Sequence, residues 1–167
     1  MRCCASVDRR IIVSIGPGGY TALRIATTSA KVLADTLGAE LIAVPSARVA
    51  SVSIEESHRP ALIALASKKN KCHASLLASD GSIEELGIID ADALSTIAPC
   101  SIIADHHLPK SFHERASILG VEVRPLRLDV RDLLVASRGI EPIDPLLCAP
   151  KYAREPDAVT QWRARGS

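Results

Sequence analysis

The sequence predicts an α/β protein with a mixed sheet, and three observations carry this prediction. Short runs rich in Val and Ile alternate with a helical pattern in the first half of the chain, as in a parallel crossover unit. Two strand-like runs joined by a short polar segment follow, which favours an antiparallel hairpin. Hydrophobic residues make up 47% of the 167 residues and charged residues 23%, a mixture that can bury a core.

The first half begins with the run RIIVSI, which ends at the turn Gly16-Pro17-Gly18-Gly19. A β-branched apolar run closed by such a turn is typical of a buried strand. Apolar side chains then recur every three or four positions, with Thr21 as the expected N-cap and Gly38 as the C-terminal stop. The expected elements are a strand at 10–15, a helix at 21–37, a strand at 40–44 and a short helix at 46–53.

The second half predicts most of the sheet. The polar joint SKKN connects two strand-like runs, and Asp80-Gly81 turns the chain into a third. Strands are expected at 61–66, 72–78, 83–89, 101–104 and 121–126, helices at 110–119 and 130–137, and an extended tail from Pro142 onward.

Composition excludes several classes of protein. The 20 Lys and Arg residues against 19 Asp and Glu leave a net charge of +1, and aromatic residues are only 2%; this argues against a dedicated nucleic-acid binder and against base-stacking platforms. The five cysteines share no C-x-x-C spacing, so neither a disulfide framework nor a zinc ribbon is expected. No apolar run approaches the ~20 residues that span a bilayer. We expect a cytoplasmic protein without a membrane segment, cofactor or metal.

The segment GPGGYTALRI lies between a strand and a helix, where ligand-binding loops of α/β proteins occur. It lacks the third glycine of the dinucleotide fingerprint and the Gly-Lys-Ser/Thr of a phosphate-binding loop. Two interpretations of its glycines therefore remain. They allow backbone amides at the helix start to bind an anion, or they only permit the backbone conformation of the turn. The candidate residues for binding a partner or an anion are Gly16, Pro17, Gly18, Tyr20, Thr21 and Arg24.

The stretch GPGGYTALRIATTSAKVLADTLGAELIAVPSARVAS resembles the signature of the TsaB (YeaZ) family, a glycoprotease-like family of partner proteins in tRNA threonylcarbamoyladenosine formation at position 37. The tail PKYAREPDA is similar to that family's C-terminal segment, with Pro150, Tyr152 and Arg154 matched. The other matched residues are Gly16, Pro17, Gly18, Thr21, Leu23, Arg24, Ile25, Ala30, Lys31, Leu33, Ala34, Leu37, Gly38 and Ser46.

This resemblance implies an actin-like ATPase (ASKHA, ribonuclease H-like) fold with an incomplete first lobe at 1–58 and a second lobe with the tail at 59–167. It implies an inactive homologue of the transferase subunit, without a cofactor, that binds a TsaD-type transferase. A TsaE-type ATPase is a further expected partner, a homodimer is compatible with the resemblance, and tRNA is contacted only indirectly.

The expected partner-facing helix carries small residues at four-residue spacing, which permits close approach of another helix. The stripe consists of Ala22, Ala26, Ala30 and Ala34, and Leu33 completes the expected partner-facing set. From the pattern alone, the same stripe could equally pack on the protein's own sheet.

The sequence departs from the family in three places. The motif begins at Gly16, whereas family members carry a strand, a hairpin and a helix before it. The family's acidic Asp-Ala-Arg-x-Gly-Glu segment corresponds to residues 66–71, ASKKNK, which are basic. Asp105-His106-His107 replaces a glycine-rich turn. A homologue that has lost its partner therefore remains an alternative.

Asp105, His106 and His107 also resemble a metal motif of DHH phosphoesterases, and DADAL at 90–94 resembles another. A small manganese-dependent phosphoesterase is the alternative function.

The isolated residues His58 and His73 are expected at the surface. Because Cys72 precedes His73 directly, a thiol–imidazole pair remains an alternative for these two residues.

Overall fold

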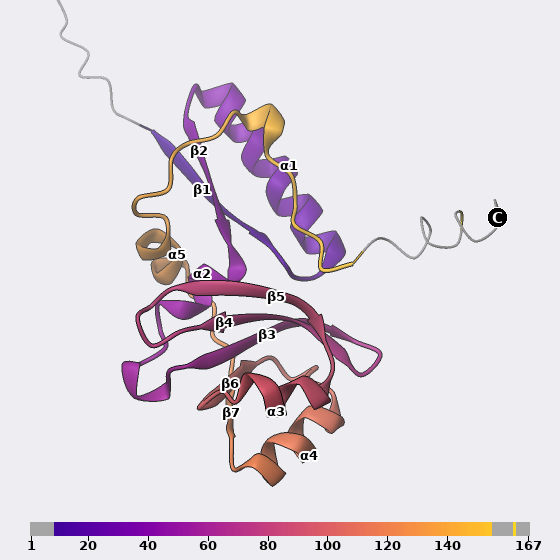
Figure 1. The fold of residues 1–167 in the computed structure, drawn as a ribbon. Helices are drawn as coiled ribbons and strands as arrows, with labels where there is room; N and C mark the ends of the chain where they lie inside the picture. The colour runs from indigo at the N-terminus through magenta and orange to yellow at the C-terminus, as the bar shows by residue number, and fades with distance from the viewer. Residues whose placement is uncertain (1–8, 155–161, 163–167) are drawn as a thin grey trace, which may run out of the picture.

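The computed structural model describes residues 9–154 and 162, apart from the side chains of residues 66 and 67. They form two lobes, each built on its own sheet (Figure 1). The first lobe begins with β1 (Arg10–Gly16), α1 (Tyr20–Leu37), β2 (Glu40–Pro45) and α2 (Ser46–Ser51). β1 and β2 pair in parallel, with α1 as their crossover connection.

The second lobe is a five-stranded mixed sheet with the strand order β5-β4-β3-β6-β7. Its strands are β3 (Ala61–Lys68), β4 (Lys71–Leu77), β5 (Ile83–Ile89), β6 (Ser101–Ala104) and β7 (Glu122–Pro125). β3, β4 and β5 pair antiparallel, and β3, β6 and β7 pair in parallel. The mixed sheet predicted from the sequence is confirmed.

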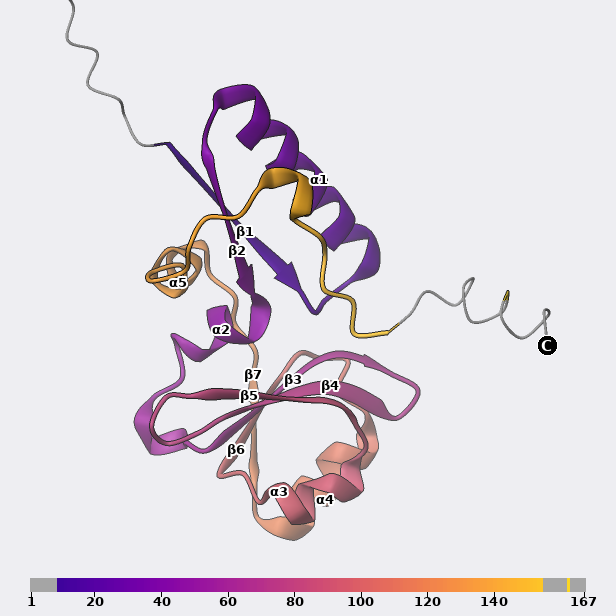
Figure 2. The ribbon, with the colours of Figure 1, turned by 45° about the horizontal axis from the view of Figure 1, so that its top comes forward.

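The helices of the second lobe cover the face of its sheet that points away from the first lobe (Figures 1 and 2). They are η2 (Ala91–Ala93), α3 (Leu94–Ile97) and α4 (Lys110–Leu119), while η1 (Glu56–His58) precedes β3. Phe112 of α4 is fully buried in this core, and α2 packs on the opposite face of the sheet. Among the described helices, none combines the length and the apolar character needed to cross a membrane.

The C-terminal segment returns to the first lobe. α5 (Val130–Ala136) completes the core around β2, and η3 (Pro145–Leu147) lies beside α1. Ile143 donates its amide to Leu41 O at 2.8 Å, and Cys148 is buried against Ala30. The structure therefore differs from the expected division at 58/59, because the apolar residues of this segment fill the core of the first lobe rather than that of the second.

Most expected elements lie where the sequence places them. The strands at 83–89 and 101–104 and the helix at 110–119 are confirmed with unchanged bounds, and so is the antiparallel hairpin. Gly38 has the left-handed φ of +57° that ends α1. The N-cap is Gly19 instead of Thr21, since Leu23 N already donates to Gly19 O at 3.0 Å. The expected tail match at 155–158 and Cys3 and Cys4 lie outside the described residues.

Candidate functional site

The glycine-rich turn between β1 and α1 packs against the returning tail. Lys151 N donates to Ile15 O at 2.7 Å. A Cβ on Gly16, whose φ is +105°, would lie 2.5 Å from the carbonyl oxygen of Lys151. Pro17 is buried and lines the cleft between the lobes, and Gly18 is half-buried. Gly16 is therefore required by the close approach of the tail, in agreement with the interpretation of the turn as backbone geometry.

The other candidate residues of the motif lie on the first turn of α1, away from that cleft. The Tyr20 ring contacts the Tyr152 ring, with centroids 4.8 Å apart and planes inclined by 31°. The Arg24 guanidinium carbon lies 5.5 Å from the Tyr20 centroid, within the range of a cation–π contact. Thr21 and Arg24 line an exposed groove along α1. The structure thus divides the predicted set between two surfaces.

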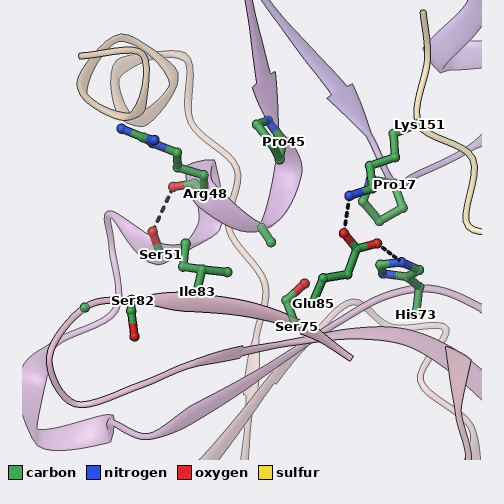
Figure 3. Close-up of a pocket in the computed structure, with 12 residues that line it drawn as sticks. Pro17, Pro45, Arg48, Ser51, His73, Ser75, Ser82, Ile83, Glu85 and Lys151 are labelled. Carbon is green, nitrogen blue, oxygen red and sulfur yellow. Dashed lines mark hydrogen bonds and ion pairs between the residues drawn. The ribbon is translucent and has the colours of Figure 1, made fainter. Parts of the chain in front are cut away.

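A cleft of about 570 Å³ separates the two lobes. Figure 3 shows Glu85 of β5 at its centre, between Lys151 of the tail and His73 of β4. The Glu85 carboxylate accepts a hydrogen bond from His73 Nε2 at 2.9 Å through one oxygen and is paired with Lys151 Nζ through the other. This bridge joins the second lobe to the segment that packs on the first.

His73 is only 5% exposed, so the expectation that it lies at the surface is wrong. Its position on β4 directs the ring to the sheet face that carries Ser75 and Leu77, and Glu85 accepts from its Nε2. Its Nδ1 is buried with no hydrogen-bond partner among the described residues. Sequence reasoning missed the cluster because Lys151 is 66 positions from Glu85, and no local pattern signals such a contact.

Cys72 and His73 do not form a thiol–imidazole pair. Neighbouring residues of a strand point to opposite faces of the sheet, and Cys72 lies in the core under α3 and α4. Burial raises the pKa of the Cys72 thiol to about 12, with smaller effects from Arg154 and Asp105. A thiol that stays protonated at neutral pH is a poor nucleophile, so the open alternative of a reactive Cys72 is not supported.

The hydrogen bond from Lys151 and, to a smaller extent, that from His73 lower the pKa of Glu85 below its usual value of 4.5. A depressed carboxyl pKa stabilises the folded protein above the pKa of the unfolded state, and this stabilisation is lost as the pH falls through the folded pKa. We expect Glu85→Gln to lower the melting temperature at pH 6 and to converge with the wild type as the pH is lowered below the usual glutamate range.

The matched control is Glu84→Gln, an exposed neighbour on the opposite face of β5. The measurement is the melting temperature by circular dichroism between pH 3 and 7. A Glu85→Gln curve that runs parallel to the wild type over the whole range would show that the bridge contributes nothing to stability.

The predicted partner-facing residues of α1 do not share one surface. Ala22 and Ala26 are exposed, and Leu33 is 50% exposed. Ala30 and Ala34 are 5% and 1% exposed and pack on the first sheet with Val13 and Leu41. The prediction is therefore corrected for Ala30 and Ala34, which cannot contact a partner in this structure.

Asp105, His106 and His107 form a polar loop after β6. Asp105 Oδ1 accepts from the backbone amide of His107 at 2.8 Å, and the exposed imidazole rings of His106 and His107 lie against each other, with centroids 3.9 Å apart. Within residues 9–154 and 162, no group of three or more His, Cys, Asp or Glu side chains could hold a metal ion. Among these residues, Asp105, His106 and His107 are thus not assembled into the kind of metal cluster that a manganese phosphoesterase uses.

Both the sequence and the fold of this chain are similar to those of known proteins. A family model described as TsaD, tRNA N6-adenosine threonylcarbamoyltransferase, matches residues 6–100, which is more than half of the chain. No curated protein matches the sequence significantly. The structure of YeaZ from Pseudomonas aeruginosa is similar with a TM-score of 0.66 and 18% identity, covering 86% of this chain and 73% of that one.

A second solved structure, an uncharacterized protein with similarity to peptidase YEAZ from Pseudomonas aeruginosa, gives a TM-score of 0.64 and 17% identity, covering 87% of this chain and 73% of that one. The YeaZ structures and the family model confirm the actin-like α/β fold and agree with the resemblance to the TsaB (YeaZ) proteins.

Proposed function

This chain belongs to the TsaD family, and from that premise we propose that it is a non-catalytic, TsaB-type subunit that binds a TsaD-type transferase. Family membership and the YeaZ-like fold support a role in tRNA threonylcarbamoyladenosine formation. The subunit role rests on one observation, an exposed apolar face on α1.

The outer surface of α1 carries large apolar side chains that the rest of the described chain leaves exposed. Ile25 is 63% exposed and Val32 is 59% exposed, and both lie opposite the buried Leu23 and Ala34. The residues of this apolar face are Ala22, Ile25, Ala26, Ser29, Val32, Leu33, Thr36 and Leu37. None of them is charged, which is characteristic of a protein interface rather than of a solvated helix.

The cleft between the lobes offers little for catalysis. The Glu85 carboxylate is already occupied by Lys151 and His73, and the Cys72 thiol is buried on the other face of the sheet. A general base works best when its pKa lies near the working pH, and the hydrogen bonds from Lys151 and His73 lower the pKa of Glu85, which makes the carboxylate a weak base. This supports a subunit that acts by binding.

The test combines Ile25→Glu with Val32→Glu in one variant and measures binding to the transferase from the same organism. Two carboxylates placed on a desolvated apolar interface would be buried without partners. We expect the dissociation constant to rise at least about 100-fold, the effect of losing an interface hot spot. Light scattering on a sizing column and titration calorimetry report the complex.

The matched control is Ile118→Glu, because Ile118 is 74% exposed on α4 of the second lobe. We expect this variant to bind like the wild type. If wild-type protein and transferase elute separately, the subunit role is wrong and the chain is a homologue that has lost its partner. Equal binding by the double variant and the control would remove α1 from the interface.

A further inference from the structure

The two lobes share an apolar contact at α2. Val49 of α2 is buried together with Ile42 and Val44 of the first sheet. Ala47 and Ala50 of the same helix are buried against β3 of the second sheet. α2 also follows β2 directly and precedes the segment that leads into β3. A short helix that packs on both lobes and connects them along the chain is suited to act as a pivot between them.

The segment 148–154, which we call the strap, passes from the first lobe to the second. Cys148 is 3% exposed in the core of the first lobe, and the Tyr152 ring packs on the Tyr20 ring. The backbone amide of Lys151 donates to a carbonyl oxygen of β1 at 2.7 Å. Apolar burial and a backbone hydrogen bond therefore anchor the strap on the first lobe.

Polar contacts join the strap to the second lobe. Lys151 Nζ is paired with the Glu85 carboxylate, and the two side chains are 38% and 44% exposed. Arg154 Nη2 donates to the carbonyl oxygens of Lys68 at 2.8 Å and of Lys71 at 3.4 Å. Partly exposed ion pairs contribute little to stability, so these contacts can be released while the anchor on the first lobe stays in place.

The cleft lies between the pivot and these polar contacts. α2 contributes Ala47, Arg48 and Ser51 to its lining, and Lys151 and Glu85 line it as well. Figure 3 shows Arg48 and Ser51 on one side of the cleft and Lys151 on the other. A pivot on one side of a cleft and a separable contact on the other is the geometry of hinged closure.

We propose that the strap is a latch that holds the cleft closed. Its contacts with Glu85 and with the turn between β3 and β4 fix the second lobe, and their release lets this lobe rotate about α2 so that the cleft opens. Arg154 is the second point of attachment beside Lys151. The proposal concerns the chain alone and does not rest on the proposed function.

The test measures the distance between the lobes in the full chain, by electron paramagnetic resonance between two spin labels. One label is attached to the exposed Cys100 of the second lobe. The other is attached through Asp35→Cys, at an exposed position of α1 outside its apolar face. Cys3 and Cys4 are replaced by serine, and the two remaining cysteines are buried, so neither reacts with the label.

The latch variant combines Lys151→Met with Arg154→Met, which removes both polar attachments and keeps long side chains at these positions. We expect one main distance in the wild type and a second, longer distance in the variant. Hydrogen exchange should show equal protection of the backbone amide at position 151, because the anchor on the first lobe remains. Glu85→Gln weakens the attachment from the other side and should also populate the longer distance.

The matched control combines Arg10→Met with Lys31→Met. It removes the same charge from contacts within the first lobe, an ion pair with Glu40 and a hydrogen bond to a carbonyl oxygen of η3, and should keep the wild-type distance. An unchanged distance in both latch variants, an equal shift in the control, or loss of protection at the anchoring amide would each overturn the proposal. Circular dichroism identifies a variant that does not fold; if the double variant is one, the Glu85→Gln result decides.

Discussion

Gly16→Ala is expected to lower the free energy of unfolding by about 3 kcal/mol, among the larger effects of a single substitution. Gly16 has a φ of +105°, which alanine adopts only with strain. The added Cβ would also lie 2.5 Å from Lys151 O and 2.7 Å from Leu23 Cδ1. Since one of these is a backbone atom, the tail would have to move away from β1.

Gly18→Ala is the matched control for this prediction. Its added Cβ would meet only the Leu23 side chain, at 3.8 Å, an ordinary contact. We expect a change within about 1 kcal/mol. Urea unfolding followed by circular dichroism measures both variants. Equal destabilisation by the two substitutions would contradict the role assigned to the approach of the tail.

The comparison between these two glycines shows what sequence reasoning could establish. A glycine-rich turn after a strand was predictable from local pattern, and so was its position before a helix. Which glycine is indispensable was not predictable, because the reason is Lys151, far along the chain. The same limit applies to Glu85, whose partners His73 and Lys151 come from another strand and from the tail.

Elements that depend on local chemistry were predicted well. The strand at 83–89 follows the Asp80-Gly81 turn, and the helix at 110–119 ends at Gly120 in its left-handed conformation. The return of the tail was missed, since an extended Pro-containing segment carries no periodicity that indicates what it packs on. His73 was misplaced for a related reason: a single polar residue in a strand does not reveal which face of the sheet is covered.

The prediction that the alanine stripe on α1 faces a partner is wrong for half of the stripe, and helix geometry explains why. Each four-residue step along an α-helix advances the side chain by about 40°, so the stripe from Ala22 to Ala34 sweeps across about 120°. Its second half therefore faces the first sheet, while its first half faces solvent. The stripe therefore crosses from the solvent side of α1 to the side that packs on the sheet, where Leu23 and Thr27 are also buried.

This rotation leads to opposite expectations for two similar substitutions. Ala30 is 5% exposed, and a glutamate there would place a carboxylate among Val13, Leu41 and Cys148. Burying an unpaired charge in an apolar core is strongly unfavourable. We expect Ala30→Glu to lower the free energy of unfolding by more than about 3 kcal/mol at pH 7. Any loss of partner binding in this variant would then result from unfolding of the first lobe.

Ala26→Glu places the same carboxylate on the exposed apolar face of α1. Its free energy of unfolding should stay within about 1 kcal/mol of the wild type, while binding to the transferase should be lost. Urea unfolding at pH 7 and at pH 4.5 separates the two variants. Burial raises the pKa of a carboxyl group, so the deficit of Ala30→Glu should shrink at the lower pH, whereas Ala26→Glu should show no such recovery. Equal stability of the two variants at pH 7 would mean that α1 does not present Ala30 to the sheet.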